Sequence, residues 1–444
     1  MLHKIYNLLL LAFLFLLPWQ TRYIWHYGEL NKGYWEYGTF SIYGTEILLW
    51  IILILFFVQH FLRKEFWVNL KTKPKRIILL LFLISAGLSL ALSKNFWVSY
   101  NYVFHILEAM ALMTVLAWQD EKTKYQIALW AGAVVQGALA ISQFLTQHIW
   151  DNKWLGMAGQ EAYNLGPSVI EFADQRWLRA YGSFGSPNSL GIYLAVLFVL
   201  GLVLYLKTES VRTKLLISVG QLLILSGLLV SFSRAAWLAA VAGALCLFVI
   251  LIYNRKLSFS PESGNPDNST NSGFPIKLGM TALKEFGKQI SFALLVVIFW
   301  LVIFYPVFTA RFNLNNRLEV KSISERQGQY AEVLSFIKSN PILGVGPGAY
   351  TDALHKKYPT LSAWQYQPIH SIYLLALVEI GLIGFLSLFF LFKRLFWLML
   401  KNNLLYMPVV VVLASAGIFD HWLISMYTGI IFWWVVWGIT YQDP

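Results

Sequence analysis

The chain of 444 residues is 58% hydrophobic, 17% aromatic and only 13% charged. A soluble globular domain carries about 25% charged residues, whereas apolar runs of about 18 or more residues, long enough to cross a bilayer, recur along this chain. The composition therefore excludes a soluble domain and predicts an all-α polytopic membrane protein. The net charge of +12 does not indicate a nucleic-acid partner, because the basic residues are spread over the loops. It indicates membrane topology and affinity for anionic lipids or a phosphorylated substrate.

The apolar runs predict about twelve transmembrane helices. The first run resembles a signal peptide, but it lacks a small-residue cleavage site, and we expect it to be retained as a helix. The predicted spans lie near residues 5–19, 41–61, 77–93, 97–118, 125–146, 189–206, 214–231, 234–253, 290–308, 371–392, 405–420 and 423–440. The only cysteine, Cys246, lies within one of them, so no disulfide can form within the chain.

The distribution of Lys and Arg predicts the orientation of these helices. The loop 62–76 and the shorter stretches 207–214 and 393–401 are rich in basic residues, whereas the loops that alternate with them carry few. Because basic loops stay in the cytoplasm, both chain ends are expected to be cytoplasmic. The alternate loops then lie outside.

The chain divides into a first membrane part, a large loop and a second membrane part. Residues 1–308 are expected to hold the first nine spans, an outer loop at 147–188, and a Ser/Asn/Pro/Gly-rich cytoplasmic loop at 254–289 whose composition predicts disorder. Residues 309–370 form the large extracytoplasmic loop. Residues 371–444 hold the last three spans.

The large loop is expected to be partly helical. The sequence SERQGQYAEVLSFIKSNP predicts an amphipathic helix that Ser324 caps together with Gln327 and that Pro341 ends. Its apolar residues at helical spacing share one face: Tyr330, Leu334 and Ile337. The loop would then fold as a cap above the membrane.

One histidine lies where this loop ends and an apolar span begins. His370 stands in PIHSIYLLALVEIGLIGF, at the expected boundary between water and lipid. An imidazole beneath a folded basic loop is placed to act as a general base on a substrate carried by a lipid. The alternative is an interfacial histidine that only anchors the end of a helix.

Three arginines are expected on the same outer face as this histidine. They are Arg179 before the sixth span, Arg234 in SFSRAAW between the seventh and eighth spans, and Arg326 in the predicted loop helix. Guanidinium groups make paired, charge-assisted hydrogen bonds to phosphate oxygens, so we interpret the three as a diphosphate site. The alternative is that each arginine reaches out to lipid headgroups.

Several further residues are candidates for the wall of the same pocket. The sequence PILGVGPGAY places glycines where the backbone can approach a ligand closely, but no strand precedes it, so it is not a dinucleotide-binding motif. The candidates are Asn188, Gly344, Gly346, Gly348 and Tyr373. No cluster of acidic residues is expected on the outer face, and the sequence predicts neither a metal nor a cofactor.

Four ionisable residues are expected within or near the spans. His105 and Glu108 are three residues apart on one helix, and we expect them to pair within the bundle, although a proton pathway is the alternative. Glu46 is expected to make a similar polar contact. Glu379 would lie roughly 13 Å deeper than His370 at the helical rise, outside the same site unless the helix breaks.

The order of three stretches resembles a known family. SFSRAAWLA, ERQGQYAEVLSFIKSNPILGVGPGAY and HSIYLLALVEIGLIG are similar to the O-antigen ligase and polymerase superfamily, over roughly residues 175–440. Its members are bacterial inner-membrane enzymes of about twelve spans with a large outer loop before a late helix. Members often have Asn after the loop histidine, whereas this chain has Ser371, which leaves the subfamily open.

The resemblance implies an inverting, metal-independent glycosyltransferase in the bacterial cytoplasmic membrane. Its donor would be a glycan on undecaprenyl diphosphate, and its acceptor a glycan or a lipid such as the lipid A core. The essential histidine of the family falls on His370, and its diphosphate-binding arginines fall on Arg179, Arg234 and Arg326. The active site would face the periplasm.

Two alternatives stay open. A polysaccharide polymerase of the same superfamily would share donor and chemistry and differ only in its acceptor. A transporter of a small anion or a lipid-linked sugar would use the same basic vestibule, but it predicts paired broken helices, buried ion ligands and internal repeats, which the sequence does not display clearly.

Overall fold

The computed structural model describes residues 2–60, 87–257 and 279–441. Within them, seven helices are long and apolar enough to cross a membrane: α5 (Phe96–Ala117), α6 (Lys122–Thr146), α7 (Pro187–Lys207), α8 (Val211–Val230), α9 (Arg234–Leu257), α10 (Gly279–Ile303) and α14 (Ile372–Asn402). Four shorter apolar helices accompany them: α1 (Leu2–Leu16), α2 (Gly44–His60), α15 (Met407–Phe419) and α17 (Tyr427–Thr440). The helical membrane class is confirmed, while the count of about twelve spans stays a prediction.

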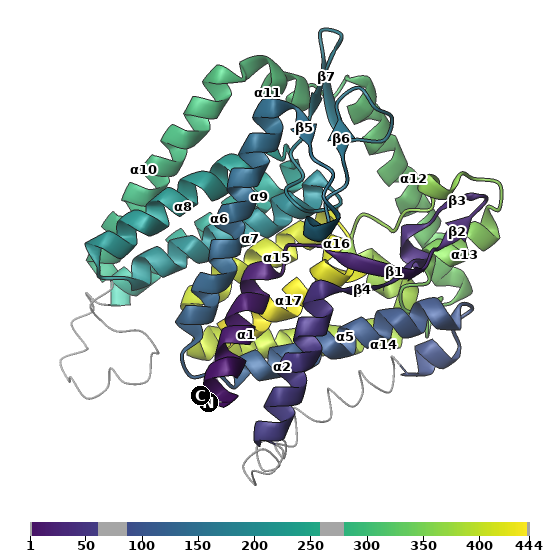
Figure 1. The fold of residues 1–444 in the computed structure, drawn as a ribbon, viewed down its shortest axis with the longest axis horizontal. Helices are drawn as coiled ribbons and strands as arrows, with labels where there is room; N and C mark the ends of the chain where they lie inside the picture. The colour runs from purple at the N-terminus through teal and green to yellow at the C-terminus, as the bar shows by residue number, and fades with distance from the viewer. Residues whose placement is uncertain (1, 61–86, 258–278, 442–444) are drawn as a thin grey trace.

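Helix α7 is the centre of the bundle (Figure 1). It is apolar around its whole circumference, and nearly all its side chains are buried, as expected for a helix surrounded by other helices. Ser186 caps its start by accepting a hydrogen bond from the Ser189 N–H, and Pro187 occupies its first turn. Helices α8, α9 and α15 pack around it, while α17 packs along α5.

Short antiparallel hairpins connect several helices, which the sequence patterns did not predict. Strands β1 (Arg22–His26) and β4 (Phe40–Tyr43) pair, and β2 (Glu29–Leu30) pairs with β3 (Gly33–Tyr34) across a two-residue turn. The remaining pairs lie between α6 and α7: β5 (His148–Ile149) with β6 (Gln160–Glu161), and β7 (Val169–Phe172) with β8 (Gln175–Leu178). The two turn residues have positive φ in both the β2–β3 and the β7–β8 hairpin, which suits the right-handed twist of the strands.

The segment between α10 and α14 folds as a helical cap, and its apolar core also includes Leu30 of β2, Val98 of α5 and Leu375 of α14. It contains α11 (Tyr305–Phe312), α12 (Arg317–Ser339) and α13 (Tyr350–Lys357). Figure 1 shows α12, α13 and the strands β1–β8 away from the region where the two chain ends lie. We call this side of the molecule the hairpin side.

The predicted start of the cap helix is wrong. Helix α12 begins at Arg317, so Ser324 lies inside the helix, where its hydroxyl donates to the Lys321 carbonyl instead of capping. The buried face of α12 also differs from the predicted one. Val333 and Phe336 are buried, whereas Leu334, which was expected on the buried face, is exposed. Ser324 does not cap the helix because the residues before it are also helical. The first turn of α12 holds the buried Glu319.

Helix α14 is longer than predicted and is broken near its outer end. The expected cytoplasmic stretch 393–401 is helical, since apolar residues at helical spacing bury there: Leu395, Leu398 and Met399. Within α14, Gly381 has φ +63 and interrupts the helix. This break allows another segment to pair with the backbone of α14, as described below.

Three predictions fall on residues that the structure does not describe. The basic loop 62–76 lies outside the described residues, and so does most of the predicted third span, 77–93, of which only 87–91 are seen to be helical. Both ends of the segment 254–289, predicted to be disordered, are helical, since α9 continues to Leu257 and α10 begins at Gly279. Its centre, 258–278, lies outside the described residues.

Candidate functional site

The turn between α8 and α9 gathers three arginines on the hairpin side. The carbonyl of Ser231 accepts a hydrogen bond from Arg179 Nε at 2.9 Å. The next carbonyl, that of Phe232, accepts one from Arg311 Nε at 3.0 Å. Arg234 follows as the first residue of α9. A three-residue turn therefore brings together arginines from the β7–β8 hairpin, from α9 and from α11.

A buried glutamate from the cap lies among these arginines. Glu319, in the first turn of α12, accepts a hydrogen bond from Arg234 Nη2 at 2.6 Å, and its other oxygen pairs with Arg311. The Glu319 side chain is only 6% exposed. Because a buried carboxylate needs partners, this contact holds the start of α12 against the membrane part.

The cluster of Arg179, Arg234, Arg311 and Glu319 has an excess of positive charge. Three guanidinium groups face one carboxylate, which leaves a net charge of +2. Burial, followed by the proximity of Arg311, lowers the pKa of Arg179 to about 9. Burial likewise lowers the pKa of Arg311, to which Arg234 and Arg326 contribute. The lowered values arise first from burial, and the neighbouring guanidinium groups add to them.

Two of the predicted arginines belong to this cluster, and Arg326 stands beside it. Arg326 lies in the third turn of α12 rather than in the first, and it makes no hydrogen bond or ion pair with any residue that the structure describes. It is close enough to lower the pKa of both Arg311 and His370. The positive charge of Arg326 therefore acts on both the arginine cluster and the histidine.

His370 lies half-buried in the turn before α14. Its backbone N–H donates to Gln329 Oε1 of α12 at 3.2 Å, which ties the turn to the cap helix. Its ring atom Nδ1 is buried and has no hydrogen-bond partner among the described residues. Burial lowers the pKa of His370, Arg326 adds to this effect, and Asp420 and Glu325 oppose it. The imidazole is therefore neutral at pH 7, the state that can accept a proton.

A second histidine packs on the first. The rings of His370 and His421 lie 5.1 Å apart between centroids. His421 precedes the short helix α16 (Trp422–Ser425), and its Nδ1 lies 2.6 Å from the Ser425 hydroxyl. Burial lowers the pKa of His421 to about 4, although Asp420 opposes the shift. A neutral His421 thus fixes the position of the His370 ring without adding charge to it.

The glycine run supports the fold and lies apart from the arginines. Gly344 has φ +73, and a Cβ atom there would lie 2.3 Å from the Glu379 carbonyl oxygen. The Gly346 N–H donates to that same carbonyl at 2.9 Å, and the Gly348 N–H donates to the Glu379 carboxylate at 2.9 Å. Beyond the break at Gly381, N–H groups of α14 donate to Pro341 and Ile342. The run is thus paired with the broken part of α14.

The other candidate wall residues also have defined places. Asn188 Oδ1 accepts a hydrogen bond from Arg179 Nη2 at 2.8 Å, so Asn188 orients a member of the arginine cluster. Tyr373 donates to the Ala414 carbonyl at 2.9 Å and faces an apolar groove of about 360 Å³ between α5, α14 and α17. Neither of these hydrogen bonds involves His370.

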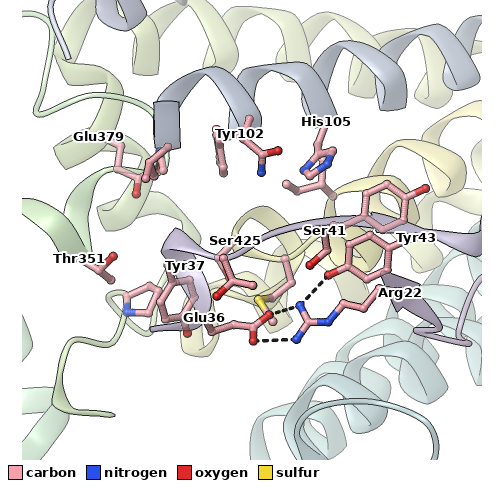
Figure 2. Close-up of a pocket in the computed structure, with 18 residues that line it drawn as sticks. Arg22, Glu36, Tyr37, Ser41, Tyr43, Tyr102, His105, Thr351, Glu379 and Ser425 are labelled. Atoms are coloured by element: carbon pink, nitrogen blue, oxygen red, sulfur yellow. Dashed lines mark hydrogen bonds and ion pairs between the residues drawn. The ribbon is translucent and has the colours of Figure 1, made fainter. Parts of the chain in front are cut away.

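A small polar cavity lies beside the two histidines. It has a volume of about 70 Å³, and its wall includes Pro368, Ser425, Glu379 and Gly348. Figure 2 shows Tyr102 and His105 projecting from α5 toward the paired Arg22 and Glu36 on the opposite side. Because the volume admits several waters but no sugar ring, the cavity is not a glycan site.

Sequence reasoning missed Arg311, Glu319 and the part played by His421. Arg311 lies three residues beyond the predicted ninth span, and an arginine so close to a span end carries the same signal that identified Arg234. Glu319 carried no such signal, because its partner Arg234 is 85 residues away in the sequence.

A comparison with protein families matches the region that holds most of this site. Residues 219–389 match the model of the O-antigen ligase family. The matched region includes Arg234, Arg311, Glu319, Arg326 and His370 but not Arg179. No curated protein matches the chain. The family match confirms the predicted resemblance to the O-antigen ligase superfamily and supports a glycan-transferring function, of ligase or polymerase type, in a membrane.

Proposed function

We propose that the chain transfers a glycan from undecaprenyl diphosphate to a glycan or lipid acceptor on the outer face of the bacterial cytoplasmic membrane. The observation that carries the proposal is the arrangement of charge on the hairpin side. Helix α12 joins the two parts of the site, because its Glu319 pairs with Arg234 and Arg311 of the arginine cluster. Further along the same helix, Gln329 accepts the His370 N–H, and Arg326 lies between Glu319 and Gln329 in the sequence of the helix. The cations suit a diphosphate, and the imidazole suits the removal of a proton.

In the proposed reaction, the donor diphosphate binds to Arg234, Arg311 and Arg326, while Arg179 adds positive potential from its buried position. The acceptor hydroxyl attacks the anomeric carbon and inverts it, and His370 accepts the hydroxyl proton. The bond from the anomeric carbon to the diphosphate oxygen breaks, and its electron pair leaves with the carrier. The guanidinium groups stabilise the charge that develops on the leaving diphosphate, in the place where other enzymes use a metal.

An apolar groove next to the arginine cluster suits the lipid part of the donor. It has a volume of about 810 Å³ and runs between α8, α9, α10 and α11. Its wall includes Phe308 and Phe312 on either side of Arg311, and Trp237, one turn after Arg234. A lipid chain in this groove would place its diphosphate at the arginines.

In the proposed site, Glu319 occupies the arginines before the donor binds. Its carboxylate holds two of the guanidinium groups in the structure. A diphosphate carries more negative charge and more acceptor oxygens than one carboxylate, so it would displace Glu319 from Arg234 and Arg311. Donor binding would then be coupled to a movement at the start of α12.

Incubation of the purified protein with an undecaprenyl-diphosphate glycan and candidate acceptors tests the proposal. We expect released carrier only when an acceptor is present, and at least about 100-fold slower release by the His370→Ala variant. The length of the product separates one-step ligation from polymerisation. Movement of the glycan across a vesicle membrane without release of carrier would favour the transporter and overturn the proposal.

A further inference from the structure

A second polar cluster lies within the bundle and plays no part in the proposed transfer. It consists of Glu46 in the first turn of α2 and His105 and Glu108 on α5. All three side chains are buried, and one nitrogen or oxygen atom from each lies within 4.8 Å of the others. The expected pairing of His105 with Glu108 is not seen, because His105 faces Glu46 instead, at 3.7 Å.

The cluster has an excess of negative charge. One Glu46 oxygen accepts from the Tyr43 N–H at 3.0 Å, and one Glu108 oxygen accepts from the Trp50 indole. The other Glu108 oxygen, Oε2, is buried without a partner among the described residues. Even with His105 protonated, two ionised carboxylates would leave a net charge of −1. A buried, unbalanced charge is costly, so the two carboxylates can ionise together only if a further cation balances them; without it, one of them keeps its proton.

Buried hydroxyl groups lie beside the unpartnered Glu108 oxygen. The Tyr427 ring lies 5.1 Å from the His105 ring between centroids, and its hydroxyl is within reach of the Thr45 hydroxyl and of both carboxylates. Neither hydroxyl donates to Glu108 Oε2 in the described parts of the chain. A buried carboxylate oxygen without a partner, in a polar surrounding, marks a place where a guest supplies the missing interaction.

The small polar cavity of Figure 2 provides access to the cluster. His105, Tyr43, Ser41 and Tyr427 contribute to its wall, so its floor lies at the cluster. Its volume of about 70 Å³ admits several waters or an ion that has lost part of its hydration shell. An ion can therefore reach the cluster from the side of the cavity that holds Arg22.

We propose that Glu46, His105 and Glu108 bind one divalent transition-metal cation of the zinc class. An imidazole nitrogen with two carboxylate oxygens is a ligand set for zinc or manganese, whereas magnesium and calcium prefer oxygen alone. Bonds of about 2.1 Å in a tetrahedral site place ligand atoms roughly 3.4 Å apart. The Glu46–His105 separation of 3.7 Å is close to this, and rotation of the Glu108 side chain brings in the third atom.

The bound cation would join α2 to α5 beneath the hairpin β1–β4. Two ligands are carried by α5, and Glu46 follows directly after β4. The site is separate from His370 and the arginine cluster, so it is structural with respect to the transfer reaction. This proposal revises the expectation from the sequence that the chain binds no metal.

Metal content and affinity test this site without reliance on activity. The full-length, untagged protein is treated with a chelator, desalted, and titrated with Zn²⁺, Mn²⁺, Mg²⁺ or Ca²⁺. We expect about one equivalent of Zn²⁺ to be retained after gel filtration, with Mg²⁺ and Ca²⁺ not retained. Glu108→Gln and His105→Gln should each weaken Zn²⁺ binding by at least about 10-fold.

A matched variant separates loss of a ligand from loss of a buried carboxylate. Glu379→Gln removes a buried carboxylate from the same cavity wall but leaves the three ligands, so Zn²⁺ affinity should be unchanged. X-ray absorption of Zn²⁺ in the unmodified protein should show one imidazole with oxygen ligands, even if a variant fails to fold. Two results would overturn the proposal: full Zn²⁺ retention by the double variant Glu108→Gln/His105→Gln, or no retention by the unmodified protein. Either result would mean that protonated carboxylates or bound water, and not a metal ion, stabilise the cluster.

Discussion

Two buried charge clusters in this molecule have opposite composition. On the hairpin side, three arginines surround one glutamate. Between α2 and α5, two glutamates accompany one histidine. Each cluster joins elements that are distant in the sequence, and in each the charges are paired only in part.

The difference indicates what each cluster is suited to bind. The arginine cluster keeps an excess of positive charge and borders an apolar groove, so it suits an anion attached to a lipid. The acidic cluster has more carboxyl than basic groups and borders a cavity of about 70 Å³, so it suits a small cation. Because partial neutralisation lowers the cost of burial and leaves capacity for a ligand, the residual charge is more informative than the number of ion pairs.

Replacement of the general base should have the largest effect. We expect His370→Ala to reduce glycan transfer by at least about 100-fold, the usual contribution of general-base assistance, while carrier binding at the arginines is retained. Transfer rate and carrier affinity are measured on the same preparation. His355→Ala serves as the control, because His355 lies in the same cap but faces Asn31. Near-normal transfer by His370→Ala would remove the general-base role.

Loss of one clustered arginine should have the next largest effect. Arg234→Ala removes a charge-assisted bond to the diphosphate worth about 1.5–3 kcal/mol, so lipid-diphosphate affinity should fall roughly 10- to 100-fold. The measurement is equilibrium binding of undecaprenyl diphosphate to protein in detergent. Arg317→Ala is the matched control, because that exposed arginine pairs with Glu171 instead. Equal affinities of the two variants would assign Arg234 to structure.

Removal of the internal carboxylate should have a smaller effect in the opposite direction. Glu319→Gln keeps the shape of the side chain but no longer competes with the diphosphate, so carrier affinity should rise several-fold. The same substitution leaves buried arginines less well balanced, so the melting temperature should fall. Both are measured on one sample. Weaker carrier binding by a folded Glu319→Gln protein would contradict the displacement of Glu319 by the donor.

The pH dependence of transfer should show the smallest shifts. Protonation inactivates a general base, and the pKa of His370 is below its ordinary value of 6.5, so kcat/KM should fall only below pH 6.5. Arg326→Gln should raise the pKa of His370 and move this fall to higher pH, because Arg326 lowers that pKa. Glu325→Gln should move it to lower pH, because Glu325 raises the pKa of His370. Shifts with the reverse signs would show that the titrating group is not His370.

Much of the membrane part could be predicted from the sequence. The span expected at 97–118 is α5 at Phe96–Ala117, and the span expected at 125–146 is α6 at Lys122–Thr146. Such agreement arises because an apolar run that crosses the bilayer must match its thickness, so the length of the run predicts the length of the helix. The hairpins were missed because their strands, of two to five residues, are too short for a periodic pattern.

The candidate site was predictable only in part. Arg234 and His370 stand at the ends of apolar runs, where a charged or titratable residue is conspicuous. The pairing of Glu319 with Arg234 was not predictable, because it depends on how the cap packs on the α8–α9 turn. For the same reason, the glycine run suggested a ligand, whereas its backbone pairs with the broken helix α14.

The central claim is that the arginine cluster binds the carrier diphosphate within reach of His370. An electron cryo-microscopy structure of the protein with undecaprenyl diphosphate tests it most directly. We predict the diphosphate within hydrogen-bonding distance, about 3.2 Å or less, of at least two of the side chains Arg234, Arg311 and Arg326, with Glu319 released. A diphosphate bound elsewhere, with the Glu319 pairs intact, would contradict the account.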